Sequence, residues 1–476
     1  MLLPWLTLFD FRSIFANLVR PKEMDYKKKC EDFVILIPIF NNAKYLTNLD
    51  FLKKYGKKVI LCTTNLETYE FYADLDRIRA EYGFNVVRTS FKKNVKNPWK
   101  IYHKTLLAHD YVLGQSLKAL DAKYVIFLDA DTKCETDLSY LAGTMEKLNY
   151  DLASVRVIPS KTESAAENLQ YIEYNMAMKS RRVYPWLTSG AAMIGKREVL
   201  KRIMDKHSLF FNGGDIEIGK LANLMGFKVG HIPLTFYTDV PETFYKLFRQ
   251  RFSWFCGAFR HSIINAHTNL FSPIYAVYFA LIIFLMLPFK IYELFFHWYV
   301  FPFIFLFYLT INFVTNWEIR SKYMFAFPLY SLAQVIILPI FGIGKYVKTV
   351  FKTGNVGFIK VFYKKGYHPT KYAVNLLLIT ALILALTNIT LVEHILGLNN
   401  IDLLSFTGVS FSSSNLLILI FNELKLFIMA TSLFLFIFFG CKTIIYAREN
   451  KIRYREIYKE TLDKVSRKLA LFVSCF

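Results

Sequence analysis

Cysteine is scarce and scattered in this sequence. No two of the six cysteines form a Cys-x-x-Cys pair. A disulfide scaffold or a structural zinc site needs closely spaced thiols, so neither is expected, and the thiols fit a reducing compartment. The six are Cys30, Cys62, Cys134, Cys256, Cys441 and Cys475.

Acidic residues are also in short supply, with 37 Asp and Glu against 59 Lys and Arg and a formal net charge of +22. No aromatic-interleaved platform or reading helix accompanies this charge, so no nucleic-acid partner is expected. The lysines gather instead where a nucleotide diphosphate or anionic lipid headgroups would meet them. One group is Lys92, Lys93, Lys96, Lys100 and Lys104, and the other is Lys345, Lys348, Lys352, Lys360, Lys364, Lys365 and Lys371.

The N-terminal segment lacks a small-residue cleavage site. Its apolar start, residues 1–20, is interrupted by Asp10 and Arg12 and is short for a membrane span. We therefore expect residues 1–32 to form an amphipathic segment at the membrane interface, with a poorly inserted anchor as the alternative.

Long apolar runs are absent up to about residue 268, and they dominate the chain after it. With 54% hydrophobic residues overall, the chain is too apolar for one soluble protein of its size. Residues 272–289, 294–317, 372–392 and 424–446 each have the length and composition of a spanning helix. Residues 272–446 are thus predicted to form an α-helical transmembrane region of about four spans.

No Lys or Arg lies between Lys371 and Lys425. This absence predicts that the loop around residues 399–414 lies outside the cell. The basic tail at residues 447–476, the lysine-rich segment before Lys371 and the soluble half then face the cytoplasm of a protein integral to the plasma membrane. Because the soluble half and the lysine-rich segment are expected on the same side, an even number of membrane crossings must separate them. The Pro- and Gly-interrupted run at 323–345, within 323–371, is therefore expected to be interfacial or re-entrant; an ordinary span is the alternative.

The soluble half alternates apolar strands with amphipathic helices, which predicts an α/β domain with a mixed, mainly parallel sheet. Ligands of such sheets bind beyond the carboxyl ends of the strands. We assign residues 33–240 to this catalytic domain and residues 241–271 to an interfacial segment that binds the acceptor. Strands are predicted at 33–38, 58–62, 85–87 and 124–128, and helices at 68–82 and 103–119.

Two aspartates, Asp129 and Asp131, follow the strand predicted at 124–128. Alternate side chains of an extended chain share a side, so both carboxylates could converge on one cation. Hard oxygen ligands suit Mg²⁺ or Mn²⁺, and phosphate oxygens can complete the shell. Taken alone, the pattern is more typical of a solvated loop than of a metal site.

Two later motifs carry similar ambiguity. Asp215 follows a double glycine at the start of a predicted helix, where a carboxylate either caps the helix or serves as a general base. Gln250, Arg251 and Trp254 stand directly before the first apolar run, either as a juxtamembrane anchor or as substrate contacts.

Together, the order of these motifs resembles the membrane-integrated family 2 glycosyltransferases, which include cellulose, chitin and hyaluronan synthases. The resemblance covers about residues 33–260 and implies a GT-A-like nucleotide-sugar domain. It also implies a metal-dependent, inverting hexosyltransferase that elongates a polysaccharide at the membrane and can couple elongation to translocation of the product. Its partners would be a nucleotide-sugar donor, a growing glycan or lipid acceptor, and membrane lipids.

The resemblance also implies roles for individual residues. Asp215 would be the catalytic base. The implied metal ligands are Asp131 and Asp129, the implied nucleotide-sugar contacts are Pro38, Asn41, Asn65, Lys100, Asp129 and Arg251, and the implied acceptor contacts are Gln250, Trp254 and Gly190.

Departures from the family pattern leave questions open. Asn65 and the threonines before it stand where the family commonly has an Asp near the nucleobase, so a UDP-sugar is expected but recognition of uracil is open. Gly214 replaces a Glu of the base motif, which leaves Asp215 as the base and Glu217 in reserve.

A further departure is Ser253, which replaces the Arg of the family's Gln-x-x-Arg-Trp motif. Arg251 or Arg249 would then have to supply the missing diphosphate contact. This change and the small number of spans favour the alternative function, a single transfer that makes a membrane glycolipid. A catalytically inactive scaffold is the remaining alternative from another class.

Overall fold

The computed structural model describes residues 26–91, 104–269 and 301–361, apart from residue 317, and a few isolated positions between 284 and 298. The chain divides into two compact units, and the first comprises Met1–Thr268 and Phe279–Lys365. Several predicted features lie outside the described residues: most of segment 1–32, Lys92, Lys93, Lys96, Lys100, the spans at 272–289, 372–392 and 424–446, and the tail at 447–476.

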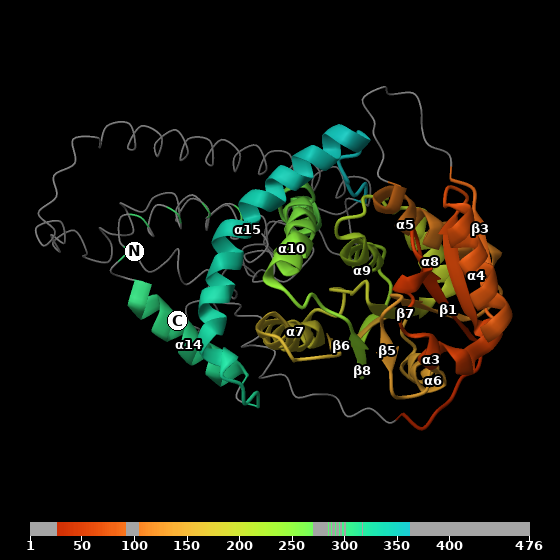
Figure 1. Cartoon of the computed structure of the whole chain (residues 1–476), viewed down its shortest axis with the longest axis horizontal. Coiled ribbons are helices and arrows are strands. Elements are labelled where there is room, and N and C mark those ends of the chain that lie inside the picture. Colours follow the sequence, from red (N-terminus) through yellow and green to blue (C-terminus); the bar gives the residue numbers. More distant parts are fainter. Residues whose placement is uncertain are drawn as a thin grey trace, which may run out of the picture. The chain divides into compact units, whose positions relative to one another are not determined.

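The described residues contain one eight-stranded sheet in the order β3-β2-β1-β4-β7-β6-β8-β5 (Figure 1). Strands β3, β2, β1 and β4 are mutually parallel, β6 and β8 are parallel to each other, and β7 and β5 run antiparallel to their neighbours. The predicted mixed, mainly parallel sheet is therefore confirmed. The strands are β1 (Phe33–Pro38), β2 (Val59–Thr64), β3 (Asn85–Thr89), β4 (Tyr124–Leu128), β5 (Lys133–Cys134), β6 (Leu152–Pro159), β7 (Ala192–Lys196) and β8 (Val229–Thr238).

The four strands predicted from the sequence are β1 to β4. Strands β2 and β4 are buried along their whole length and β1 along most of its length, because neighbouring strands and covering helices enclose them. Central parallel strands are apolar on both faces for this reason, which explains their near-continuous hydrophobic sequences.

Several helices of the catalytic domain, α4, α6, α7 and α10 among them, begin at side chains that cap them. Thr68 accepts a hydrogen bond from the Phe71 N–H at the start of α4, and Ser164 and Glu167 form a capping box at the start of α7. The main helices here are α4 (Tyr69–Tyr82), α5 (Lys104–Ser116), α6 (Leu138–Leu148), α7 (Ala165–Val183), α8 (Arg197–Met204), α9 (Gly214–Leu224) and α10 (Phe244–Phe259). Shorter elements are η1 (Ala43–Tyr45), α3 (Leu49–Leu52), η2 (Lys53–Lys58), η3 (Leu117–Ala119), η4 (Arg260–Ile264) and α11 (Ala266–Asn269).

Two later helices follow, α14 (Phe301–Thr315) and α15 (Tyr323–Thr353). Helix α15 packs against α7 and α10, and α14 packs against α15 (Figure 1). The run predicted to be interfacial or re-entrant is one continuous helix, although Pro328 and Pro339 lie inside it. Of the described helices, α15 is the one long and apolar enough to cross a membrane, and a single such helix is weak evidence of insertion. The membrane position of residues 323–345 stays a prediction.

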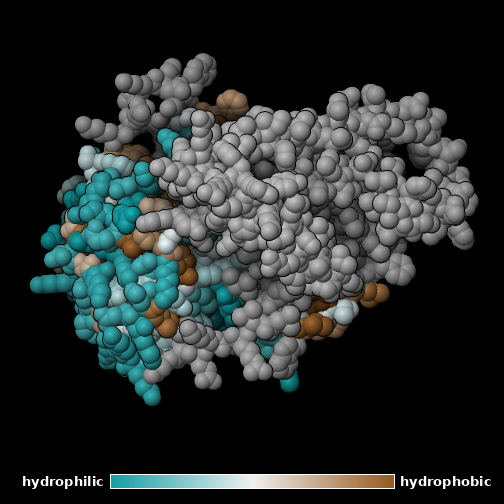
Figure 2. All heavy atoms as spheres, turned by 180° about the vertical axis from the view of Figure 1, so that it is seen from behind, coloured by the Kyte–Doolittle hydropathy of each residue, from teal (hydrophilic) through white to brown (hydrophobic). Residues whose placement is uncertain are grey.

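The polarity of the surface differs between the catalytic domain and the helices α14 and α15. In the view of Figure 2 the described surface of the catalytic domain is mostly hydrophilic. Large apolar side chains are exposed on α14 and α15, as expected for surfaces that meet lipid or further apolar helices. They include Leu306, Phe313, Val314, Phe325, Leu329, Ile337, Ile340, Phe341, Val347 and Phe351.

After α15 the chain returns to the catalytic domain. The Asn355 side chain donates to the Ser208 carbonyl at 2.8 Å, and Asn265 donates to the Gly357 carbonyl at 2.9 Å. The Ile359 N–H donates in turn to the Asn265 side chain at 2.7 Å. The segment before residue 362 is therefore tied to the loop that precedes α9 and to the end of α10.

Candidate active site

Asp129 and Asp131 lie in a turn directly after β4. The Thr132 N–H donates to the Asp129 carbonyl at 3.1 Å and closes this turn. The hydroxyls of Thr132 and Thr238 each donate to Asp131 Oδ1 at 3.1 Å. Because the strand ends before both aspartates, the turn rather than strand alternation sets their directions. Both side chains remain partly exposed at the carboxyl end of β4.

The two carboxylates carry poorly compensated negative charge. Burial and the charges of Asp131 and Asp215 raise the pKa of Asp129 to about 6, against the opposing effect of His109. Burial also raises the pKa of Asp131, while hydrogen bonds from Thr238 and Thr132 oppose the rise. Within the described ranges, neither carboxylate has a Lys or Arg ion-pair partner.

A divalent cation fits this site chemically, since it would relieve the repulsion between the two carboxylates. Hard oxygen donors with open coordination positions suit Mg²⁺ or Mn²⁺, which keep water and phosphate oxygens as further ligands. The part of the chain that the structure describes offers no cluster of three or more Asp, Glu, His or Cys side chains for a metal. A cation here would therefore need further ligands from outside the described residues, such as water or phosphate oxygens.

Asp215 lies in the first turn of α9. The segment at residues 190–191 links it to the turn after β4, because the Ala191 carbonyl accepts a hydrogen bond from the Asp129 N–H at 3.0 Å. The Gly190 N–H donates to Asp215 Oδ2 at 2.8 Å and fixes the direction of the carboxylate, which is partly exposed. Gly190, predicted as an acceptor contact, thus orients the predicted base through its backbone.

The surroundings of Asp215 pull its pKa in both directions. Burial raises the pKa, hydrogen bonds from the Ile216 and Gly190 N–H groups and the charge of Arg181 lower it, and the charge of Asp110 raises it; the net result is a raised pKa. A raised carboxylate pKa suits a general base, because the base gains proton affinity.

The double glycine before Asp215 is a packing requirement. Gly213 has φ +79°, and a Cβ there would lie 2.9 Å from His261 Nε2. A Cβ at Gly214 would lie 2.3 Å from Asp110 Oδ2. The Glu that the resembled motif has at this position therefore does not fit, and the carboxylate of Asp110 takes up that space.

His109 and Asp110, on α5, join the site although the sequence pattern gave them no role. His109 Nδ1 and Asp110 Oδ1 are 2.9 Å apart. Burial lowers the pKa of His109, but the hydrogen bond to Asp110 and the charges of Asp110, Asp129 and Asp215 outweigh it and raise the pKa overall. A polar His-Asp pair within an otherwise apolar helical stretch was the available signal.

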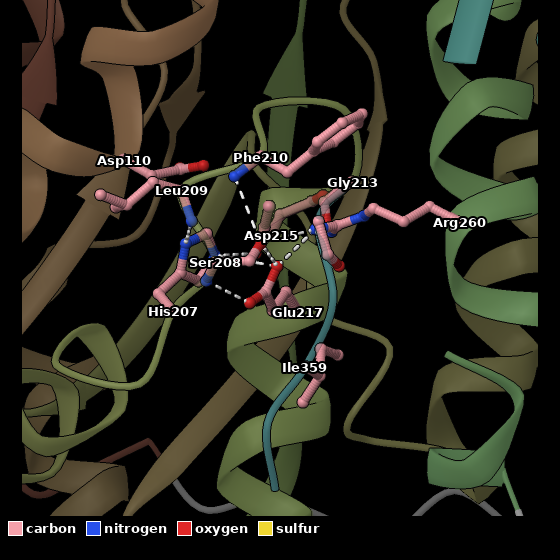
Figure 3. Close-up of polar contacts among 12 residues, drawn as sticks. Asp110, His207, Ser208, Leu209, Phe210, Gly213, Asp215, Glu217, Arg260 and Ile359 are labelled. Carbon is pink, nitrogen blue, oxygen red and sulfur yellow. Dashed lines mark hydrogen bonds and ion pairs between the residues drawn. The ribbon is translucent and has the colours of Figure 1, made fainter. Parts of the chain in front are cut away.

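Glu217, the reserve candidate for the base, is fully buried. Its carboxylate pairs with Arg260 at 2.6 Å and accepts hydrogen bonds from the N–H and hydroxyl of Ser208, each at 2.6 Å (Figure 3). A carboxylate so enclosed cannot reach an acceptor, so Glu217 is a structural residue. Its ion pair joins the start of α9 to the end of α10.

The predicted acceptor motif lies on α10. Arg251 is 1% exposed, pairs with Glu173 at 2.9 Å and donates to Gln250 Oε1 at 2.8 Å. Its guanidinium stacks 3.7 Å from the ring centroid of Trp254, which is 44% exposed. Arg251 therefore fixes Trp254 and Gln250 in place. A direct contact between Arg251 and diphosphate stays a prediction.

Ser253, which stands where the family has an arginine, has a lysine from a later helix beside it. Lys345 of α15 donates a hydrogen bond to the Ser253 hydroxyl. A cation from a helix almost a hundred residues later thus stands beside Ser253. Sequence comparison by position could not reveal this replacement.

The predicted nucleotide side lies at the carboxyl ends of β1 and β2. Pro38 ends β1 opposite Cys62, and the Asn65 side chain accepts from the Phe91 N–H at 2.9 Å. Asn41 has φ +65°, and its N–H donates to Glu67 Oε2 at 2.9 Å. Glu67 therefore supplies a carboxylate near the place where the family commonly has an Asp.

Comparison with known proteins gives the class. Residues 124–340 match the family model described as glycosyl transferase family group 2, a region slightly under half of the chain. The protein carries a family 2 glycosyltransferase domain, and it is a glycosyltransferase. The implied GT-A-like character of its mixed sheet stays a prediction.

Solved structures of glycosyltransferases are among those found similar. The mannosyltransferase PcManGT from Pyrobaculum calidifontis, in complex with GDP-Man and Mn²⁺, is 14% identical over 73% of this chain and 94% of its own, with a TM-score of 0.42. TarS from S. aureus, in complex with UDP, is 14% identical over 67% and 92%, with a TM-score of 0.31. Glucosyl-3-phosphoglycerate synthase from Mycobacterium tuberculosis is 13% identical over 47% and 79%, with a TM-score of 0.29. No curated protein matches the chain.

Proposed function

We propose that this glycosyltransferase transfers a sugar from a nucleotide diphosphate with inversion of configuration, and that Asp215 is the base. The observation that carries the proposal is that neighbouring residues of one segment contact both parts of the site: the Gly190 N–H donates to Asp215 at 2.8 Å, and the Ala191 carbonyl accepts from the Asp129 N–H at 3.0 Å. Asp215 takes the proton of an acceptor hydroxyl as the hydroxyl oxygen attacks the anomeric carbon of the donor sugar. The bond from that carbon to the diphosphate oxygen breaks on the opposite face.

Asp129 and Asp131 would hold Mg²⁺ or Mn²⁺ on the donor diphosphate. Such a cation stabilises negative charge on the leaving diphosphate. The hydroxyls of Thr132 and Thr238 keep Asp131 turned toward this site. His109 lies near Asp129 and Asp215 and adds a positive charge there when it is protonated.

The donor is proposed to be a UDP-sugar. The turn after β1 with Asn41, the end of β2 with Asn65, and Glu67 offer amide and carboxylate groups for a nucleoside. Thermal unfolding with a panel of sugar nucleotides and Mn²⁺ identifies the donor, because a ligand stabilises the folded state according to its affinity. Stabilisation by UDP-sugars alone is expected; stabilisation by GDP-sugars alone would contradict this choice.

For the acceptor, we propose a growing polysaccharide at the plasma membrane. The half-exposed ring of Trp254, held by Arg251 and 6.1 Å from the Tyr174 ring, offers an aromatic face for a sugar. The charge of Lys345 beside Ser253 removes one argument for a single-transfer enzyme, since a cation is present where the family arginine is missing. A membrane glycolipid is the alternative product.

The product distinguishes these possibilities. Membranes that contain the full-length protein are incubated with radiolabelled donor, and the products are separated by chromatography. Polymer stays at the origin, and a glycolipid migrates. NMR of the new linkage gives its configuration: a β-linkage from an α-linked donor is expected, and retention of the α-configuration would overturn the inverting mechanism.

A further inference from the structure

A cleft of about 720 Å³ lies away from the carboxylates of the proposed active site. Its walls are one face of α7, the neighbouring residues of β6 and β8, the loop after β6, and the turn between α14 and α15. Asn175 of α7 donates to Glu318 of that turn at 2.8 Å, which joins two of the walls.

Positive charge dominates this cleft. Four cations in its lining, Arg156, Lys161, Arg182 and Arg320, have no carboxylate partner within the described part of the chain. The lining contains a single carboxylate, Glu318, and this one is already paired with Lys179.

Arg156 and Arg182 form the centre of this charge. Both are partly buried, one on β6 and the other on α7. Burial and the charge of Arg156 lower the pKa of Arg182, and they outweigh the opposing effect of the Glu318 charge. Burial and the charges of Arg181, Arg182 and Arg156 lower the pKa of His231, also in the cleft, to about 3. Like charges held together in a cavity favour an anion between them.

The cleft is separate from the donor diphosphate. On β8, Tyr237 lines the cleft, whereas the next residue, Thr238, is buried and donates to Asp131 at 3.1 Å. Successive side chains of a strand point to opposite faces of the sheet. The cleft and the proposed metal site therefore lie on opposite faces of the sheet at β8.

We propose that this cleft binds a phosphate monoester or diester through the guanidinium groups of Arg156 and Arg182. The planar fork of Arg matches two phosphate oxygens at once, and the surrounding lysine and arginine side chains add long-range attraction. The phosphate belongs either to a lipid headgroup or to a soluble ester. Arg320 follows the predicted span at 294–317, which would place the cleft beside the headgroup layer.

Binding is measured on purified full-length protein in detergent, without a sugar nucleotide. One arm titrates inorganic phosphate against chloride at constant ionic strength, and the other compares phosphatidic acid with phosphatidylcholine in mixed micelles. Thermal unfolding reports both. Phosphate or phosphatidic acid should stabilise the wild type, and the double variant R156Q/R182Q should bind about tenfold more weakly or worse.

The double variant R77Q/R79Q, on α4 beside the other end of the sheet, removes the same charge and should bind as the wild type does. R156K/R182K, which keeps the charge but loses the fork, should bind several-fold more weakly and serves if the glutamine variant does not fold. Binding in the lipid arm alone identifies a headgroup; binding to inorganic phosphate identifies a site open to soluble phosphates. Equal binding by wild type and arginine variants, or none by either, overturns the proposal. Because no sugar is transferred, the result is independent of Asp215.

Discussion

The pKa of Asp215, the proposed base, depends on a few neighbouring residues. Burial and Asp110 raise its pKa, and Arg181 and two backbone N–H groups lower it. A base works when deprotonated, so turnover falls as the pH drops through its pKa. The acid limb of the rate profile should therefore lie above the pH at which an exposed Asp titrates.

Replacing Arg181 by Gln should shift that limb. Removal of the positive charge leaves the pKa of Asp215 higher, so activity is lost at a higher pH than in the wild type. The measurement is kcat/KM against pH at saturating Mn²⁺, with R79Q as a control that should leave the limb in place. A limb that stays in place or moves to lower pH in R181Q would argue against Asp215 as the base.

Replacing Asp110 by Asn should shift the acid limb in the direction opposite to the shift expected for R181Q. Loss of its negative charge lowers the pKa of Asp215, so the acid limb moves to lower pH. Asn keeps nearly the same shape against Gly214, and circular dichroism checks the fold. An upward movement of the limb, in a variant that folds normally, would refute the assigned position of Asp110 beside the base.

At the scale of elements, the sequence predicts the parts that depend on local pattern. β1, β2 and β4 are continuous apolar runs between turns, and α4 carries its cap at Thr68 and ends before a glycine. The site is predictable only as separate motifs, because nothing local reveals that Asp110 fills the space beside Gly214. Likewise, no sequence pattern predicts that Lys345 contacts Ser253, because the periodicity of a helix does not show which distant helix it will contact.

The buried pair of Glu217 and Arg260 is predicted to be important for stability. Arg260→Met would leave the Glu217 carboxylate buried without its cation, at a cost of about 3–5 kcal/mol. The exposed pair of Arg88 and Asp76, 2.8 Å apart, is the control, and Arg88→Gln should cost about 0–1 kcal/mol. Unfolding of both variants and the wild type in one detergent compares them. Equal losses in the two variants would contradict the structural role of Glu217.

The contact between α15 and α10 gives a second test at this scale. Lys345→Gln should lower turnover, because the site loses the cation beside Ser253. Ser253→Arg added to that variant restores a cation at the family position and should recover part of the rate. The comparison is kcat at saturating donor. Normal turnover in K345Q would mean that the lysine only packs the two helices.

For the whole molecule, the catalytic domain and the helices after it meet through specific polar contacts. Asn175 and Lys179 of α7 contact Glu318 directly after α14, and residues 355–359 bind the loop that precedes α9 and the end of α10. These contacts hold residues 318 and 355–359 against the catalytic domain, and the orientation of the chain in a membrane stays a prediction. The residues proposed to bind the donor, act as base and bind the acceptor come from segments spread over more than two hundred residues, from Pro38 to Trp254.

Substitution of Asp215 by Asn tests most directly the claim that this carboxylate is the base of an inverting transfer. Full-length wild type and D215N are compared for sugar transfer and for donor binding with Mn²⁺, with D205N at an exposed carboxylate as control. Transfer by D215N should fall by about a hundredfold to ten-thousandfold while donor affinity stays close to that of the wild type. Transfer at the wild-type rate by D215N would contradict the claim.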